Sequence, residues 1–354
     1  MLGRGQETMR ALVTTGDGTF ELQTVEIPRP GPSEVLIEVK AAAGNHTDWK
    51  TLSSHPRAGN VMGADFSGVV VSLGAGVRGR EIGQRVAGCV RGNTTPNGSF
   101  AQYLCTDSKL LVDLPDHVSF EEGAQLGVSI YAACLSLFDL LKLPPPTTTA
   151  ADGQSVPPNE ILVWSGTSVT GYYAIQLAKL AGLRVISTSS PSHFHQVKAS
   201  GADLVFDYSD SFTPRRIYAA TEGRLKLAVD CVSQGMTPAQ VSHCLSEEGG
   251  KIATVLPYKS RKKGVETELV WVYSMWGEET QQPLYYPACP ERYEAAVGYS
   301  KMVSELLAQK KLTVGPIKVF PKGLASVTAG LEQMKAGKVS AEKFIYRISD
   351  TPGL

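Results

Sequence analysis

The segment "AAAGNHTDWK" (residues 41–50) places an imidazole, a hydroxyl, a carboxylate and an ammonium within five residues, at His46, Thr47, Asp48 and Lys50. Such a set could bind a metal ion, hold a polar cofactor or donate a proton. Zinc prefers a closed set of thiolate, imidazole and carboxylate ligands, and one histidine with a distant aspartate does not supply it. We therefore predict that the protein does not use zinc, and that His46 is a structural or cofactor-facing residue.

A second group of residues suited to binding lies in "WSGTSVTGYYAI" (164–175), between a buried strand and an amphipathic helix. A dinucleotide fold needs glycine where the backbone turns sharply and approaches the pyrophosphate, with the helix N-terminus directed at the negative charge. Gly166 and Gly171 meet the two outer requirements, and the hydroxyls and amides between them can bond phosphate oxygens. The segment is not GxGxxG, so a turn without a ligand remains the alternative.

The end of the next strand, "STSSPSHFHQVK" (187–198), bears on which dinucleotide would bind. An NAD site usually has Asp or Glu here to hold the ribose 2′-hydroxyl, and this segment has no acid. Ser189, Ser190 and His193 are small donors suited to a 2′-phosphate, so NADPH is favoured over NADH. The plainer alternative, a serine that caps the following helix, is compatible with phosphate binding. Tyr208 could stack on the adenine or be a core tyrosine.

The hydrophobic pattern of the chain predicts the elements that position these residues. Residues 1 to about 125 consist of short strands punctuated by Gly and Pro, as in an all-β unit. From 160 to 257, four strand–helix units and a fifth strand imply a parallel sheet with right-handed crossovers. The polar, Pro-rich segment 143–160 is predicted to be a surface loop. A long helix at 291–312 and a terminal strand at 343–348 complete the chain.

Composition limits the classes of function. The 354 residues are enough for two domains, and 34 basic residues against 34 acidic residues leave no net field to attract nucleic acid or an anionic membrane. The chain shows neither the apolar run of a signal peptide nor a membrane-spanning stretch of ~20 apolar residues. The six cysteines are scattered without a CxxC pair, which indicates buried thiols in a reducing compartment. We expect a cytoplasmic enzyme with no nucleic-acid or membrane partner.

The order of these parts resembles the medium-chain dehydrogenase/reductase family over almost the whole chain. The resemblance rests on "VEIPRPGPSEVLIEVKAAAGNHTDWK", "GADFSGVVVSLG" and "VAGCVRG...GSFAQYL", which occur in that order. It implies an α/β fold in which a Rossmann-type parallel-sheet domain is inserted into a β-rich GroES-like catalytic domain. The expected Rossmann NADP-binding domain covers 131–294, and the expected catalytic domain covers 1–130 plus 295–354.

The same resemblance supports the absence of zinc. Zinc members of the family hold the metal by a Cys before His-Thr-Asp, by a Gly-His-Glu segment and by a later Cys. Here Asn45 stands at the first place, and Ala64 and Asp65 stand where His and Glu would be. The four-cysteine structural zinc lobe is absent. The chain therefore resembles the zinc-free branch, which includes quinone reductases and enoyl reductases that use NADPH.

A closer resemblance is to the fungal trans-acting enoyl reductases of polyketide synthases, the lovastatin-pathway type. It rests on "NHTDWK", "GVSIYAACLSLF", the Pro-rich loop, "STSSPSHFHQVKASGADLVFDYSD" and "GKVSAEKFIYRI". These enzymes reduce the α,β-double bond of a polyketide held as a thioester on the synthase's acyl carrier protein, in secondary-metabolite biosynthesis. The resemblance implies that activity, NADPH as cofactor, a polyketide synthase as partner and a monomeric state.

The resemblance also implies site residues. Lys50 would be a cofactor ligand or the electrostatic and proton-donating group, with a solvated surface lysine as the alternative. Tyr131, where these reductases commonly carry threonine facing the substrate, would supply a phenolic donor or fill part of the channel. The expected cofactor-binding positions are Thr47, Asp48, Trp49, Lys50, Gly166, Thr167, Ser168, Val169, Thr170, Gly171, Ser189, Ser190, Pro191, Ser192, His193, Tyr208, Val255, Leu256, Ser340 and Ala341. The expected substrate channel, for which a hydrophobic core is the alternative, is lined by Ala132, Ala133, Leu135, Ser136, Asp139, Tyr273, Met275 and Trp276.

Three functions remain open at this point. The first is a trans-acting enoyl reductase, and the second is a zinc-free quinone or alkenal reductase that acts on free small molecules. The third is a non-redox relative that binds the polyketide or its synthase. A basic docking patch for an acidic carrier protein would separate the first from the second. Arg215, Arg216 and residues 259–263 are candidates for it, although a run of charge is often only a solvated face. Ser165, where the family often has glycine, is a further departure.

Overall fold

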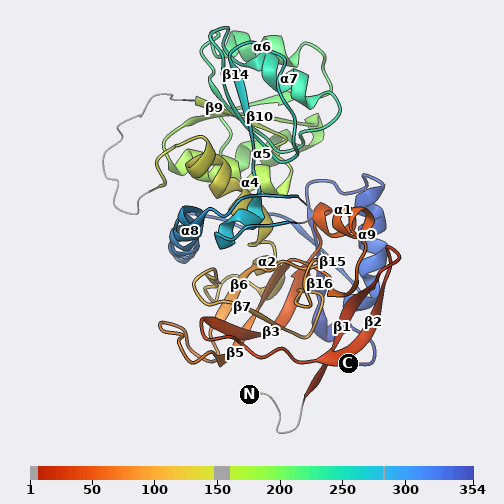
Figure 1. Cartoon of the computed structure of the whole chain (residues 1–354). Helices are drawn as coiled ribbons and strands as arrows, with labels where there is room; N and C mark the ends of the chain where they lie inside the picture. Colours follow the sequence, from red (N-terminus) through yellow and green to blue (C-terminus); the bar gives the residue numbers. More distant parts are fainter. Residues whose placement is uncertain (1–6, 147–159, 282–283) are drawn as a thin grey trace. The chain divides into compact units, whose positions relative to one another are not determined.

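The computed structural model describes residues 7–146, 160–281 and 284–354 (Figure 1). The chain divides into two compact units, residues 1–128 with 273–354 and residues 129–272. The second boundary between the units was expected between 294 and 295, whereas in the structure it lies between 272 and 273. The difference arises because the segment after 272 packs on the first unit, where Met275 Sδ lies 3.8 Å from Cys89 Sγ. The predicted loop at 143–160 falls almost wholly outside the described residues.

The first unit contains two β-sheets, in agreement with the predicted β-rich unit. A three-stranded sheet has the order β2-β1-β4, and a larger sheet has the order β15-β16-β3-β5-β6-β8, with β7 also paired to β3. The strands are β1 (Thr8–Thr15), β2 (Phe20–Glu26), β3 (Glu34–Ala43), β4 (Ala58–Val61), β5 (Asp65–Leu73), β6 (Arg85–Cys89), β7 (Tyr103–Asp107), β8 (Val112–Asp113), β15 (Ile317–Phe320) and β16 (Lys343–Arg347).

Pairing between distant strands completes the larger sheet. β16, near the end of the chain, pairs antiparallel with β3, with Tyr346 opposite Ala42. On its other side β3 pairs antiparallel with β5, with Ala43 opposite Asp65. The core of the unit is apolar and aromatic, since Phe66, Phe100 and Phe344 are wholly buried. This packing fixes β16 and β5 on either side of β3.

Short helices connect and cover these sheets. Helix α1 (His46–Ser54) follows β3 directly and contacts α9 (Val327–Lys335). The longest helix, α8 (Pro290–Ala308), contacts β8. The remaining short helices of the unit are α2 (Phe120–Gly123) and the 3-10 turns η3 (Val272–Trp276), η4 (Gly323–Ser326) and η5 (Ile348–Asp350). None of the helices within the described residues is long and apolar enough to cross a membrane.

The second unit is a parallel six-stranded sheet with the order β11-β10-β9-β12-β13-β14 (Figure 1). Its strands are β9 (Glu160–Trp164), β10 (Arg184–Ser189), β11 (Leu204–Asp207), β12 (Leu227–Asp230), β13 (Gly250–Thr254) and β14 (Val265–Leu269). Its helices are α4 (Val169–Leu180), η2 (Pro191–His193), α5 (Phe194–Ala199), α6 (Thr213–Ala220) and α7 (Thr237–Cys244). The predicted Rossmann-type alternation is confirmed, with β14 as an additional strand that pairs with β13.

Helix α3 (Val128–Cys134) leads into the second unit and continues as a π-helical turn, η1 (Leu135–Leu140). Tyr131, Ala133 and Leu135 in this stretch are at most 2% exposed. The stretch 128–140 is therefore helical throughout, with a wider turn in its second half. All six cysteines are free thiols, and four of them are buried.

Candidate active site

A buried ion pair lies beside α1 in the first unit. The ammonium of Lys343 is 2.9 Å from Asp65 Oδ2 and 2.6 Å from Asn45 Oδ1. The Lys343 side chain is 5% exposed and that of Asp65 is 0% exposed. A buried charge requires a partner of opposite sign and hydrogen bonds, and this ammonium has both. Asn45 and Asp65 stand at two of the positions where the resemblance places zinc ligands in zinc members of the family. Here both side chains bind an ammonium instead. The described part of the chain holds no group of three His, Cys, Asp or Glu side chains that could bind a metal ion.

Asp65 also fixes the start of α3. Its Oδ1 accepts a hydrogen bond of 2.6 Å from the backbone N–H of Val128. Gly127 allows this approach, because a Cβ at that position would lie 2.2 Å from Asp65 Oδ1. The carboxylate therefore connects the Lys343 ammonium to the first turn of the helix that carries Tyr131.

Asp48 holds α1 from inside the protein. Its Oδ2 accepts the backbone N–H of Asn45, the N-cap residue, at 2.7 Å, and its Oδ1 accepts from Asn93 Nδ2 at 3.2 Å. Burial is the largest cause that raises the pKa of Asp48, to about 7. The whole residue is 0% exposed, so its carboxyl holds the helix from inside the protein.

The other predicted residues of α1 are more accessible. Thr47, Trp49 and Lys50 are half-buried, and the Lys50 ammonium lies 5.7 Å from the centre of the Trp49 ring. No ion pair with Lys50 is recorded among the described residues, and burial lowers the pKa of its ammonium. His46 is exposed and accepts a hydrogen bond of 3.3 Å from Trp49 Nε1. Lys50 is thus a half-buried cation beside the ring of Trp49.

The predicted channel residues of the first unit differ in how far they are buried. Met275 is wholly buried against Cys89, as expected of a core residue. Tyr273 is 5% exposed, burial raises the pKa of its phenol, and nearby Thr47 opposes that increase. Trp276 is half-buried, and its ring carries the guanidinium of Arg91 at 4.9 Å from its centre.

The glycine turn of the second unit is closely packed at the point where the chain enters α4. Ser168 is the N-cap of α4, and its Oγ accepts from the N–H of Gly171 at 3.1 Å. A Cβ on Gly171 would lie 2.2 Å from the carbonyl oxygen of Ser165, and one on Gly166 would lie 2.4 Å from Ser187 Oγ. Ser165 has a φ of 69°, a left-handed conformation in which glycine is common. The 12-residue helix α4 therefore begins with its N–H groups held beside a tight turn.

Polar side chains gather at the carboxyl end of β10, which Ser189 ends. Ser190 Oγ lies 3.1 Å from Ser192 Oγ and 3.0 Å from His193 Nδ1, and the distance from Ser192 Oγ to His193 Nδ1 is 3.0 Å. Tyr208 follows β11 and is 49% exposed, so it is not the core tyrosine that was one alternative. The nearest strand-end carboxylate in the pairing, Asp207, stands opposite Ser189, and its Oδ1 accepts from the N–H of Ser209 at 2.9 Å.

Sequence reasoning missed Asp230, which ends β12. Asp230 is 0% exposed; its Oδ1 accepts from the N–H groups of Val232 and Ser233, and its Oδ2 accepts from the hydroxyl of Tyr258 at 3.2 Å. Ser233 Oγ in turn accepts from the N–H of Val255, a predicted cofactor residue, at 2.9 Å. The feature that could have revealed it is in the sequence itself, because Asp230 is an acid at the end of the apolar segment "LKLAVD" (225–230).

The remaining predicted positions lie in several places. Ala132 and Ser136 are buried in the α3–η1 stretch, and Ser136 Oγ donates to the carbonyl of Ala132 at 2.6 Å. Asp139 lies 3.5 Å from Lys142. Ser340 is exposed in the loop before β16, where the next residue, Ala341, has a φ of 55°. Of the proposed docking patch, Arg216 pairs with Asp210, Lys262 pairs with Glu247, and Arg215 and Lys263 are exposed.

The β-rich unit and the inserted parallel sheet define a medium-chain dehydrogenase/reductase. Residues 31–116 match the family model of the alcohol dehydrogenase GroES-like domain, and residues 170–262 match the model described as zinc-binding dehydrogenase. Within this class the chain belongs to the trans-enoyl reductase family. It is 34% identical to the trans-enoyl reductase ACTTS2 of Alternaria alternata, over 96% of this chain and 99% of that protein. It is 35% identical to the trans-enoyl reductase RAP1 of Pyricularia oryzae, over 91% of this chain and 92% of that protein.

Solved structures agree with this fold at lower identity. The CurK enoyl reductase superposes with a TM-score of 0.75 at 19% identity, over 96% of this chain and 99% of that chain. The mycobacterial protein Rv1454c, solved in complex with NADPH, superposes with a TM-score of 0.73 at 21% identity and the same coverage. The expected family and fold are therefore confirmed, and the protein is an oxidoreductase of this class.

Proposed function

We propose that the protein is a trans-acting enoyl reductase that uses NADPH. Its substrate would be the α,β-unsaturated thioester of a polyketide carried by the acyl carrier protein of a separate polyketide synthase. Full-length similarity to relatives named trans-enoyl reductases supports this reaction. The structural observation that carries the proposal is Lys50, a half-buried ammonium on α1 with no recorded ion pair among the described residues.

The second unit supplies a set of groups that fits NADPH. The N-terminus of α4, with the close approach that Gly166 and Gly171 permit, suits a pyrophosphate. Ser190, Ser192 and His193 offer two hydroxyls and an imidazole to a 2′-phosphate, and Tyr208 offers an exposed ring to the adenine. When bound, the cofactor supplies the hydride that adds to the β-carbon of the substrate.

Lys50 would act on the charge that this addition creates. Hydride addition to the β-carbon moves the electrons of the double bond toward the thioester oxygen, which becomes an enolate. An ammonium near that oxygen stabilises the negative charge, and it is more effective when half-buried because the local dielectric constant is low. The same group can then donate a proton to the α-carbon, which completes the saturated thioester, and its lowered pKa favours that donation. The phenol of Tyr131 is the second candidate donor.

The experiment follows NADPH oxidation by absorbance with a short α-methyl enoyl thioester of pantetheine. NADH and a simple quinone serve as alternative reactants. We expect turnover with NADPH and the thioester, a loss of at least ~100-fold in kcat for Lys50→Met, and partial recovery for Lys50→Arg. Lys301→Met, on the exposed side of α8, is the matched control and should retain full activity. Tyr131→Phe tests whether the phenol donates the proton.

Each result leads to a definite assignment. Turnover of the quinone without the thioester would place the protein among reductases of free small molecules. An active Lys50→Met would remove Lys50 from the mechanism while leaving the reaction intact. If no acceptor supports NADPH oxidation, including the polyketide bound to its carrier protein, the reductase proposal is contradicted. That result would favour a relative that binds polyketide without reducing it.

A further inference from the structure

A small basic pocket lies in the first unit, beyond the residues assigned above. Its volume is about 240 Å³, and it is bordered by the residues that follow α1, the loop after β6 and the segment after η3. Its lining includes two arginines, Arg57 and Arg91, and one histidine, His55. Glu279 is its one carboxylate among the described residues. The Glu279 side chain accepts a hydrogen bond from Gln281. The lining itself therefore carries two guanidinium groups against one carboxylate.

The cations of this pocket are incompletely paired. Arg57 is exposed and has no ion pair recorded in the described parts of the chain. Arg91 Nη1 lies 3.0 Å from Glu278, and its guanidinium stacks on Trp276. Its Nε and Nη2 are buried and have no hydrogen-bond acceptor in the described structure. Buried donors left without an acceptor are unfavourable, so a bound anion would be favourable here.

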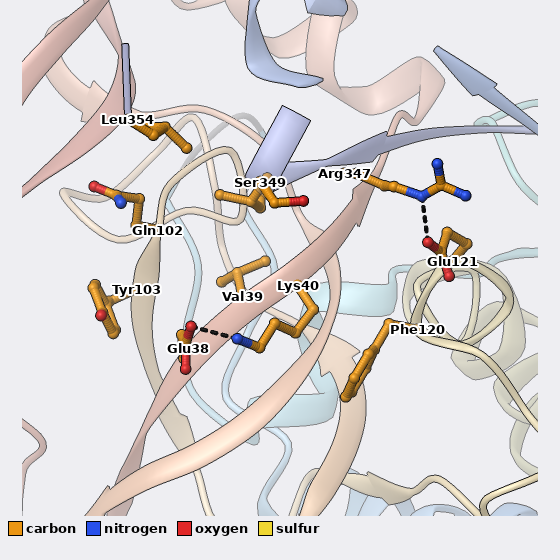
Figure 2. Close-up of a pocket in the computed structure, with 11 residues that line it drawn as sticks. Glu38, Val39, Lys40, Gln102, Tyr103, Phe120, Glu121, Arg347, Ser349 and Leu354 are labelled. Carbon is orange, nitrogen blue, oxygen red and sulfur yellow. Dashed lines mark hydrogen bonds and ion pairs between the residues drawn. The ribbon is translucent and has the colours of Figure 1, made fainter. Parts of the chain in front are cut away.

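The larger pocket of the same unit provides a contrast (Figure 2). Its volume is about 370 Å³, and it also contains two basic side chains. Figure 2 shows that Lys40 is paired with Glu38 and that Arg347 is paired with Glu121. Both cations are therefore already neutralised, and the larger pocket offers no free charge to an anion. Only the smaller of these two pockets combines a free guanidinium with unsatisfied donors.

The smaller pocket adjoins the site described above. Tyr273, which contacts the Thr47 region of α1, also lines the pocket. Asn93 lines it as well, and the same side chain donates to Asp48 inside α1. An anion held by Arg57 and Arg91 would thus lie next to the helix that carries Lys50.

We propose that this pocket binds the phosphate of a 4′-phosphopantetheine arm, the group that links an acyl thioester to a carrier protein. Arginine suits this role because its planar fork donates two parallel hydrogen bonds to phosphate oxygens and keeps its charge at all relevant pH values. Arg57 supplies the free guanidinium, and Arg91 supplies the two unsatisfied donors. This inference rests on the proposed function, because it assigns the part of the substrate that the pocket recognises.

The test uses two substrates that differ only in the phosphate. The same α-methyl enoyl chain is attached to pantetheine and to 4′-phosphopantetheine, and kcat/KM is measured for each with NADPH. We expect the wild-type protein to prefer the phosphorylated substrate by about tenfold or more, since charge-assisted hydrogen bonds contribute ~1.5–3 kcal/mol. Arg57→Gln and Arg91→Lys should each lower that preference, and both together should bring it close to one. Arg29→Gln, an exposed arginine of the same unit, should leave it unchanged.

Calorimetric titration with free 4′-phosphopantetheine gives a second readout that does not require turnover. Binding should be detectable in wild-type protein and in Arg29→Gln, and much weaker in Arg57→Gln. A preference near one in the wild-type protein, or one that survives both substitutions, would overturn the proposal. A rise in KM for NADPH in the variants, with the preference unchanged, would show that the pocket serves the cofactor instead. If neither thioester is reduced, the reductase proposal fails, while the titration still decides whether the pocket binds this phosphate.

Discussion

The Lys343 ammonium lies 2.9 Å from Asp65 Oδ2, although the two residues are separated by 278 positions in the sequence. They come from β16 and β5, which pair with opposite sides of β3 at its Ala41–Ala43 end. Ala41, Ala42 and Ala43 of β3 are wholly buried between them. Because small side chains occupy the central strand, a lysine from one neighbour can reach the carboxylate of the other.

Removing one partner of this ion pair should be costly. Lys343→Met would leave the Asp65 carboxylate buried without its cation, and we expect a loss of about 3–5 kcal/mol in the free energy of unfolding. Urea unfolding monitored by fluorescence measures this loss. The double variant Lys343→Met with Asp65→Asn should recover part of it, because no buried charge remains. Lys318→Met, which removes a half-exposed lysine, is the control and should change stability by less than ~0.5 kcal/mol. A double variant less stable than Lys343→Met would contradict this interpretation.

The buried carboxyl of Asp48 should make stability depend on pH. Its pKa in the folded protein is about 7, above the ordinary value of 3.8, so between these values the folded protein holds a proton that the unfolded chain releases. The stabilisation is therefore complete below about pH 4 and is lost as the pH rises to about 7, by at most ~4 kcal/mol. Asp48→Asn cannot titrate, so its stability should fall less steeply across this window. Unfolding at several pH values measures the two slopes, and equal slopes would contradict the assignment.

Two glycine substitutions should have opposite effects. Gly171→Ala places a Cβ 2.2 Å from the Ser165 carbonyl, which backbone movement alone can relieve, so we expect a loss of about 1–3 kcal/mol and weaker NADPH binding. Gly298 lies on the exposed side of α8, and a Cβ there would have no heavy atom within 4 Å. Gly298→Ala should therefore stabilise the protein by about 0.5–1 kcal/mol. Thermal unfolding and cofactor titration distinguish these outcomes.

The serine and histidine group after β10 should determine the choice of cofactor. Ser190→Ala with Ser192→Ala removes two donors proposed to bind the 2′-phosphate. We expect KM for NADPH to rise about tenfold, a cost of ~1.4 kcal/mol, while KM for NADH changes little. Steady-state kinetics with both cofactors provide the measurement, and Ser211→Ala, an exposed serine after β11, is the control. An equal rise for both cofactors would place these serines away from the phosphate.

Much of the fold follows from local patterns in the sequence. The strands β9 to β13 and the helices between them were predicted because their apolar residues repeat with the period of a strand or a helix, which each short segment carries by itself. The turn at 165–171 was predicted for a similar reason, because Gly166 and Gly171 act on their immediate neighbours, whereas the cap formed by Ser168 was found in the structure. The edge strand β14, "VETEL", is polar and half-buried, and its place in the sheet depends on pairing with β13.

The sequence by itself determined the alternating strands and helices of the second unit, the family and the glycine turn at 165–171, because each depends on residues close together in the chain. Only the tertiary structure decided that Lys343, one of 34 basic residues, lies buried against Asp65 and Asn45. It also decided that Asp48 faces inward, whereas Lys50, two positions later, is half-buried. The physical reason is that β3 must first pair with both β5 and β16, and no local pattern specifies which distant strands meet.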